Sequence, residues 1–350
     1  MTMTTDTGNH SHKTSGRLIH YALSDNFLFF ILTWVFFGLY YGNVLYIARQ
    51  NSFFTWNLEG LHEVWNHSYG ILWIIGRMLL QTCQFPILGG GLLALILTLI
   101  SWQFGYVCRL RDNVSYLKFI PAFIYIFIVV YKGFDIYYQT ETGMLFGIPF
   151  CILFILACQS VFILSFSRKN MPELFGTPSD RQATGRRKGY AAITILLVTT
   201  CVFNEWQRPY VRPTVKMQRQ LELHDWEGMR KTAERADMNY MTIAAYFAIA
   251  RMENTNDISK VPFDALPKVS RPIYLHNRNG NPDTGRNYSL LDYGMASHRY
   301  DLAYELAKSS LADDGSSIHL LKSLIRICHA LNKTEEAEQY ERLLHLAPFE

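Results

Sequence analysis

Residues 85–107, FPILGGGLLALILTLISWQFGYV, form an uncharged apolar run that decides the fold class of this 350-residue chain. A bilayer core about 30 Å thick requires roughly 20 apolar residues in a spanning helix. The run lacks the alternation of a β-strand, and backbone groups in lipid must be satisfied within the segment, so we predict a transmembrane helix. Pro86 suits its first turn, and Gly89, Gly90 and Gly91 offer a smooth face for another helix.

Further apolar runs on both sides complete a predicted membrane domain at residues 25–208. We expect about five spanning helices, at residues 27–48, 85–107, 119–138, 144–166 and 190–206. The predicted fold class is all-α: a polytopic helical membrane domain followed by a soluble helical-repeat domain at residues 209–350. Residues 1–24 are polar and aperiodic, which predicts a disordered cytoplasmic tail rather than a cleaved signal peptide.

The segment at residues 58–84 has a mixed character. Its apolar side chains recur at helical spacing, while polar ones such as Glu59, Glu63 and Arg77 fall mostly outside that stripe. This pattern predicts an amphipathic helix in the membrane interface. Two isoleucines interrupt the polar side, so a re-entrant or spanning segment remains the alternative.

The distribution of lysine and arginine predicts the orientation of the membrane domain. With the N-terminus inside, the inner loops carry eleven of these residues and the outer segments three, as the excess of positive charge on the cytoplasmic side requires. Five spans then place residues 209–350 outside the cytoplasm. A sixth span at 58–84 would reverse this parity and contradict the charge bias.

Two sets of basic residues are candidates for contact with lipid head groups. Arg186, Arg187 and Lys188 directly precede the last predicted span, where they would meet anionic lipids, although a topology anchor is the simpler explanation. Arg77 is the second candidate, since a charge near an apolar run suggests a function. A place on the polar side of the interfacial helix is the simpler explanation for Arg77.

Three turns in the C-terminal part share one layout. A larger residue stands three positions before one that faces the first helix, in the pairs Trp226 and Met229, Tyr300 and Ala303, and Thr334 and Ala337. We expect the larger residue to fill the turn and the other to let the second helix pack on the first. Such helix pairs stack into a solenoid. They resemble the tetratricopeptide repeat, although the spacing varies and the usual glycine of the first helix is absent.

The layout of the whole chain carries a second resemblance. It rests on Tyr40-Tyr41, Gln50, Phe53-Phe54, Gly70, Leu80-Gln81, the run Gly89-Gly90-Gly91 and the turn Asp225-Trp226. On these residues the chain resembles a family of uncharacterised inner-membrane proteins of Bacteroides-type bacteria, with a multi-span N-terminal region and a tetratricopeptide-like periplasmic tail. The resemblance implies no activity, and the tail of that family is longer than this one.

The sequence contains no pattern that names a reaction. Zinc-binding spacings, the Gly-x-Ser-x-Gly elbow and His-Glu-x-x-His are all missing, so we expect no cofactor and no metal. A net charge of only +4 gives no reason to expect nucleic-acid binding. Besides the lipid bilayer, we therefore expect a protein partner, bound by the periplasmic repeats of a membrane-anchored scaffold or assembly protein.

The alternative function is a C-type membrane glycosyltransferase, or another enzyme that acts on lipid-linked sugars. Such enzymes carry an acidic residue, usually aspartate, in the first outer loop, where this chain offers Glu59 and Glu63. It has fewer predicted spans than those enzymes usually need. A separate expectation concerns the last predicted helix, which no polar capping helix follows. We expect Leu343, Leu344 and Leu346 to leave apolar surface for a partner or a second copy.

Overall fold

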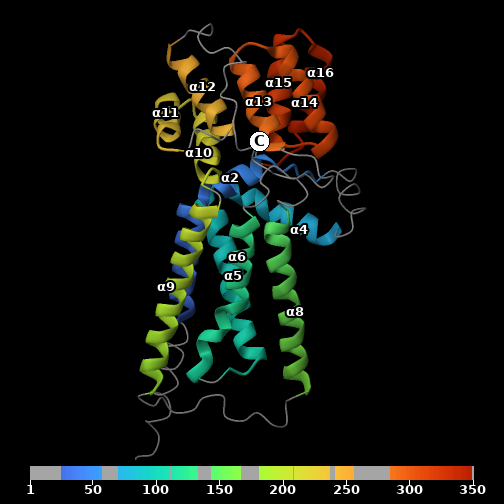
Figure 1. Cartoon of the computed structure of the whole chain (residues 1–350). Coiled ribbons are helices and arrows are strands. Elements are labelled where there is room, and N and C mark those ends of the chain that lie inside the picture. The colour runs from blue at the N-terminus through green and yellow to red at the C-terminus, as the bar shows by residue number, and fades with distance from the viewer. Residues whose placement is uncertain are drawn as a thin grey trace, which may run out of the picture.

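The computed structural model describes residues 25–56, 70–110, 112–132, 143–166, 181–207, 209–236, 241–255 and 284–348. Within these residues all regular structure is helical, which confirms the predicted all-α class for this part of the chain. Figure 1 shows long helices side by side in a bundle and shorter C-terminal helices stacked at one end of it.

The bundle begins with the helix Asp25–Tyr40, which is followed by a bend of 62°. Its other elements in chain order are η1 (Phe36–Tyr40, the last turn of that helix), α2 (Gly42–Gln50), α4 (Gly70–Leu80), η2 (Gln81–Gln84), α5 (Pro86–Val107), η3 (Asp112–Phe119), α6 (Ile120–Lys132), α8 (Met144–Phe166) and α9 (Arg181–Gln207). The bend follows the π-helical turn η1, and such irregularities commonly bend helices. As a result α2 lies across the end of the bundle beneath the C-terminal stack (Figure 1).

A few bundle helices are long and apolar enough to cross a membrane. They are α5 and the Met144–Ile163 part of α8, with the bent pair of Asp25–Tyr40 and α2 as a third candidate. The apolar helices Ser115–Val130 and Ile193–Phe203 are shorter than the roughly 20 residues that a span needs. Within the described residues, length and composition therefore support two or three of the five predicted spans. Residues 1–24, 58–69 and 133–138 of the predicted segments lie outside the described residues.

Glycines make close helix contacts in the bundle. A Cβ atom added to Gly90 of α5 would lie 2.6 Å from the backbone nitrogen of Gly38 in η1. A Cβ atom added to Gly76 of α4 would lie 1.9 Å from the carbonyl oxygen of Gly143. Backbones approach this closely only where side chains are missing. The small face predicted at residues 89–91 is confirmed by the contact of Gly90 with Gly38.

The C-terminal stack consists of short helices that pack in chain order. They are α10 (Val211–Glu222), α11 (Trp226–Glu234), α12 (Met241–Thr255), α13 (Thr284–Ala296), α14 (Tyr300–Asp314), α15 (Ile318–Ala330) and α16 (Thr334–Leu344). Each of these helices contacts the next one along the chain. The stack is therefore built from local contacts, as expected for helix pairs placed in series.

Helix α2 joins the stack to the bundle, because α10 packs on it. The Arg219 guanidinium of α10 donates to Oδ1 of Asn43 at 2.8 Å, and the Tyr46 hydroxyl of α2 donates to the Glu222 carboxylate at 2.6 Å. Bonds in which one partner is charged are stronger than neutral ones. They fix the position of the stack relative to the bundle.

Candidate functional site

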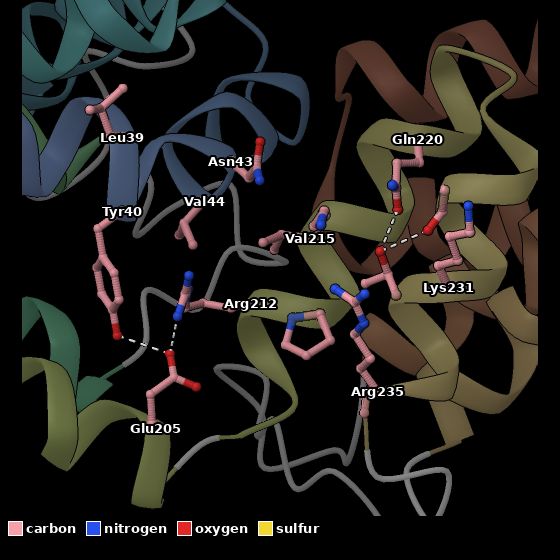
Figure 2. A pocket seen from close by; sticks show the side chains of 15 residues that line it. Leu39, Tyr40, Asn43, Val44, Glu205, Arg212, Val215, Gln220, Lys231 and Arg235 are labelled. Atoms are coloured by element: carbon pink, nitrogen blue, oxygen red, sulfur yellow. Dashed lines mark hydrogen bonds and ion pairs between the residues drawn. The ribbon is translucent and has the colours of Figure 1, made fainter.

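A pocket of about 560 Å³ lies where the bundle meets the stack (Figure 2). The bundle contributes Leu39 and Tyr40 from η1 and Asn43 and Val44 from α2, and the end of α9 contributes Glu205. The remaining lining residues come from α10, from α11 and from the two residues that follow α11. The site therefore exists only because segments far apart in the sequence meet at this junction.

Two pairs of basic side chains line the pocket from the hairpin of α10 and α11. Arg212 and Lys216 stand four residues apart in α10, and Lys231 and Arg235 stand four apart at the end of α11. Residues at this spacing share one face of a helix. Pro213 lies in the first turn of α10, where the missing backbone N–H costs little. The hairpin thus presents four cations to one pocket.

The turn between α10 and α11 sets the position of these cations. Asp225 caps α11 by accepting a hydrogen bond from the backbone nitrogen of Gly228 at 2.9 Å. The Thr232 hydroxyl of α11 donates to Oε1 of Gln220 in α10 at 3.1 Å. Gln220, Gly228 and Thr232 also line the pocket, so its floor is part of the hairpin contact itself (Figure 2).

Glu205 is the one carboxylate among the described lining residues, and it already has two partners. It forms an ion pair with Arg212 and accepts a hydrogen bond from the Tyr40 hydroxyl at 2.9 Å. The Arg212 guanidinium also lies 4.1 Å from the centre of the Tyr40 ring, within the range of a cation–π contact. The charge of Glu205 therefore neutralises that of Arg212 and leaves the other three cations of the pocket unneutralised by this carboxylate.

Those three cations differ in their partners. Nζ of Lys231 lies 3.3 Å from the carboxylate of Glu227, one turn earlier in α11. Hydrogen bonds from Arg230 and then Lys231 lower the pKa of Glu227 to about 2, so this carboxylate is ionised at neutral pH. Lys216 and Arg235 are exposed, and the described residues place no carboxylate within ion-pair distance of either. Among the described residues, the pocket consequently has an excess of positive charge.

The three turns with the shared layout have the same backbone conformation. Their first residues, His224, His298 and Asn332, have positive φ values of 55°, 57° and 59°. In each turn the next residue donates its backbone N–H to the carbonyl five positions earlier, at 2.8–2.9 Å. A left-handed residue that closes a helix in this way is a recurrent C-terminal cap. The similarity of the three turns thus extends from sequence to backbone geometry.

The burial of the predicted turn-packing residues depends on their position in the turn and on their size. Met229, Ala303 and Ala337 are fully buried at 0% exposure. Of the three larger residues, Trp226 and Tyr300 are half-buried, whereas Thr334 is exposed. Threonine is too short to fill the space that an aromatic ring covers, which explains the difference.

Sequence reasoning missed one glycine contact in the stack. A Cβ atom added to Gly294 of α13 would lie 3.2 Å from the Cβ atom of Ala303 in α14. A glycine in the first helix of a pair was expected to be absent, and this contact corrects that expectation for the pair α13 and α14. The signal was present, because Gly294 stands nine residues before Ala303 in a helix otherwise rich in large residues.

The candidate lipid contacts fall in different surroundings. Arg77 is only 9% exposed, and its guanidinium donates to the carbonyl of Phe53 at 3.1 Å. The approach of α4 to α8 through Gly76 turns this side chain inward, which corrects the expectation of an open polar surface there. Arg186, Arg187 and Lys188 belong to the first half of α9 itself. The candidate carboxylates Glu59 and Glu63 lie outside the described residues.

The leucines after the last turn are unequally covered. Leu343 is 40% and Leu346 is 44% exposed, whereas Leu344 packs against the core of the stack. Two of the three residues expected to leave apolar surface therefore do so within the single chain.

The comparisons with known proteins concern the first half of the chain. Residues 19–178 match a family described as a family of unknown function (DUF6057). The matched segment includes the bundle helices up to α8, whereas α9 and the C-terminal stack follow it. No curated protein and no solved structure matches the chain. The segment that carries the candidate membrane spans is thus similar to a family without an assigned activity.

Proposed function

We propose that this protein is a membrane-anchored scaffold whose tetratricopeptide-like helical stack binds a protein partner. The observation that carries the proposal is the serial packing of α10 to α16, with one turn conformation repeated three times. Stacks of helix pairs offer extended surfaces that commonly bind proteins or peptides. The resemblance to Bacteroides-type inner-membrane proteins supports a location of the stack in the periplasm.

The fixed attachment of the stack supports a scaffolding role. Contacts of α10 with α2 hold the stack at the end of the bundle, and the Arg212–Glu205 ion pair links it to α9. A partner bound to the stack would therefore be held at a defined height above the membrane. A flexible tether would give no such control.

The last helix offers a place for the partner to bind. Leu343 and Leu346 are exposed at the end of the chain's last helix, beside the exposed polar residues Arg342 and His345. An apolar centre with a polar rim is the usual composition of a binding surface between proteins. We therefore propose that a partner with complementary apolar residues covers the outer face of α16.

A photo-crosslinking experiment tests the scaffold proposal. A photoreactive amino acid at Leu346 should give one discrete adduct in living cells, and Leu343→Asp should remove most of it. The same amino acid at Glu338 is the matched control, because about 140° around the helix separates Glu338 from Leu343. If Leu346 gives no adduct and the purified protein turns over lipid-linked sugars, the glycosyltransferase alternative replaces this proposal.

The proposed topology has its own test, for which the chain supplies an internal control. Cys108, after α5, is exposed and belongs to a loop proposed to be cytoplasmic. Ser309→Cys would place a second exposed thiol on α14 of the stack. In intact spheroplasts a membrane-impermeant maleimide should label Ser309→Cys and spare Cys108. Labelling of Cys108 alone would reverse the proposed orientation.

A further inference from the structure

We propose that the pocket at the junction binds the phosphate group of an anionic amphiphile, whose apolar chain lies along the bundle. This proposal concerns a small ligand and does not depend on the protein partner proposed above. It rests on three features of the pocket: its excess of cations, the hydrogen-bond donor of Asn43, and an apolar edge at Leu39.

The charges favour a multiply charged anion. Arg212, Lys216, Lys231 and Arg235 line one pocket. Glu205 pairs with Arg212 and Glu227 pairs with Lys231, so within the described part of the chain Lys216 and Arg235 add positive charge that no carboxylate pairs with. Like charges on adjacent helices repel each other, so their convergence is more favourable when an anion lies between them. A phosphate group offers three or more acceptor oxygens to such a set of donors, and arginine binds phosphate with good geometry.

Neutral donors in the pocket fit the same ligand. Oδ1 of Asn43 accepts a hydrogen bond from Arg219, which identifies the other end of this amide as a donor group. The volume of about 560 Å³ falls within the usual range for small-molecule sites. It is large enough for a phosphate together with a small polar substituent such as glycerol or a sugar.

The apolar edge indicates that the ligand carries a hydrocarbon chain. Leu39 lines the pocket and is 68% exposed. The Tyr40 hydroxyl lies 3.4 Å from the carbonyl oxygen of Cys201, so α9 runs beside this edge. Its neighbouring side chains Val202 and Trp206 are 63% and 74% exposed. An acyl or prenyl chain could follow this surface from the pocket into the bilayer, while the charged head stays at the boundary.

The position at the end of the bundle agrees with this arrangement. Figure 1 shows α9 running along the bundle and ending where the stack begins. Trp206, at that end of α9, is a residue type that is enriched at the membrane–water interface. A phosphate in the pocket would therefore lie at the level of the lipid head groups.

Binding of short-chain lipids to the full-length protein in neutral detergent tests the proposal. The probes are dioctanoyl phosphatidic acid, dioctanoylglycerol without phosphate, and inorganic phosphate, each measured by isothermal titration calorimetry. We expect the phosphatidic acid to bind at least about tenfold more tightly than either of the others, because it alone combines charge and chain. Equal affinity for inorganic phosphate would show that the site takes free phosphate and would overturn the amphiphile.

A pair of double variants locates the binding. Lys216→Gln with Arg235→Gln should weaken phosphatidic acid binding by roughly tenfold or more, since two charge-assisted contacts are lost. Arg326→Gln with Arg342→Gln changes the net charge equally at exposed positions in α15 and α16. Equal loss in both double variants would mean a diffuse charge effect and would overturn the site. Retained thermal stability in each variant shows that the loss is not due to unfolding.

One further substitution tests the contribution of the apolar chain separately from that of the phosphate. Leu39→Asn should weaken binding of the amphiphile while leaving the weak binding of inorganic phosphate unchanged. Unchanged amphiphile affinity would show that the chain does not follow this edge and would contradict that part of the proposal.

Discussion

The bundle and the C-terminal stack are built from the same secondary structure, but their outer surfaces are opposite in character. Bundle helices carry large apolar side chains on the outside, such as Phe154 and Ile195 at 62% exposure each. Among the described residues of the stack, the exposed large apolar side chains are Leu223, Leu302, Leu343 and Leu346. The side chains on the outer face of a helix therefore indicate whether it suits lipid or water, whereas the helical conformation of the backbone does not.

The inner contacts of the two parts differ as well. In the bundle, Gly90 and Gly38 meet backbone to backbone. In the stack, Ala303 and Ala337 pack as small side chains behind each turn, at 0% exposure. Helices in lipid gain little from burying apolar side chains and depend on close packing, whereas helices in water are stabilised by the burial of apolar area. The glycine contacts of the bundle are typical of the first case and the alanine contacts of the stack of the second.

The contrast between glycine and alanine packing can be tested by substitution, and we expect the largest loss of stability from Gly90→Leu in the bundle. The new Cβ atom would lie 2.6 Å from the Gly38 nitrogen and 2.7 Å from its Cα atom. Backbone cannot rotate away as a side chain can, so the cost should reach or exceed about 3 kcal/mol, the upper part of the overpacking range. Thermal unfolding in mild detergent would measure the loss.

The control for Gly90→Leu is Leu95→Phe, which enlarges a side chain of α5 that is already 47% exposed. We expect this control to change the unfolding midpoint little. If both variants were equally stable, the glycine contact would not hold the bundle together, and the contrast between glycine and alanine packing would fail.

A smaller effect is expected from Ala303→Leu in the stack. The substituted side chain would enter the narrow space between α13 and α14, where Gly294 approaches Ala303. Overpacking of this kind costs about 1–3 kcal/mol. Hydrogen exchange of α13 and α14 should accelerate, because the pair opens more often. Ala312→Leu makes the same change at an exposed position of α14 and should leave exchange unaffected.

Much of the architecture could be predicted because it depends on local patterns. Long apolar runs predicted α5 and α8, and the repeated layout of three turns corresponds to three similar backbone conformations. The bend after Tyr40 could not be predicted, because the π-helical turn and the crossing of α5 depend on packing between distant segments. The same apolar run, residues 27–48, thus forms two helices with different directions.

The candidate site was missed for the same physical reason. The spacing of Arg212 with Lys216 and of Lys231 with Arg235 is visible in the sequence and indicates two cationic helix faces. Nothing local shows that both faces meet Tyr40, which is more than 170 residues earlier in the chain than Arg212. The pocket follows from the docking of α10 on α2, which involves non-local contacts that a sequence pattern does not encode.

The smallest predicted effect concerns a buried pair of charged side chains in the stack. Nε2 of His319 in α15 lies 3.1 Å from the carboxylate of Asp292 in α13, which also accepts a hydrogen bond from Tyr246 of α12. Burial alone would lower the pKa of His319, and the positive charge of Arg326 acts in the same direction. The negative charge of Asp292, with a smaller contribution from Glu222, outweighs both and raises the pKa above its ordinary value. The protonated imidazole is therefore the form that favours the folded stack.

This direction determines the expected pH dependence. A raised pKa in the folded state means that the stabilisation is complete below the ordinary histidine pKa of about 6.5 and is lost as the pH rises through the folded value. The unfolding midpoint of the stack should therefore fall between pH 6 and pH 8, and His319→Gln should flatten this change. His345→Gln at an exposed position serves as the control and should keep the wild-type profile. A wild-type midpoint that rises over this range would mean that burial outweighs the Asp292 carboxylate, and the pair would then be held as a neutral imidazole beside its acid.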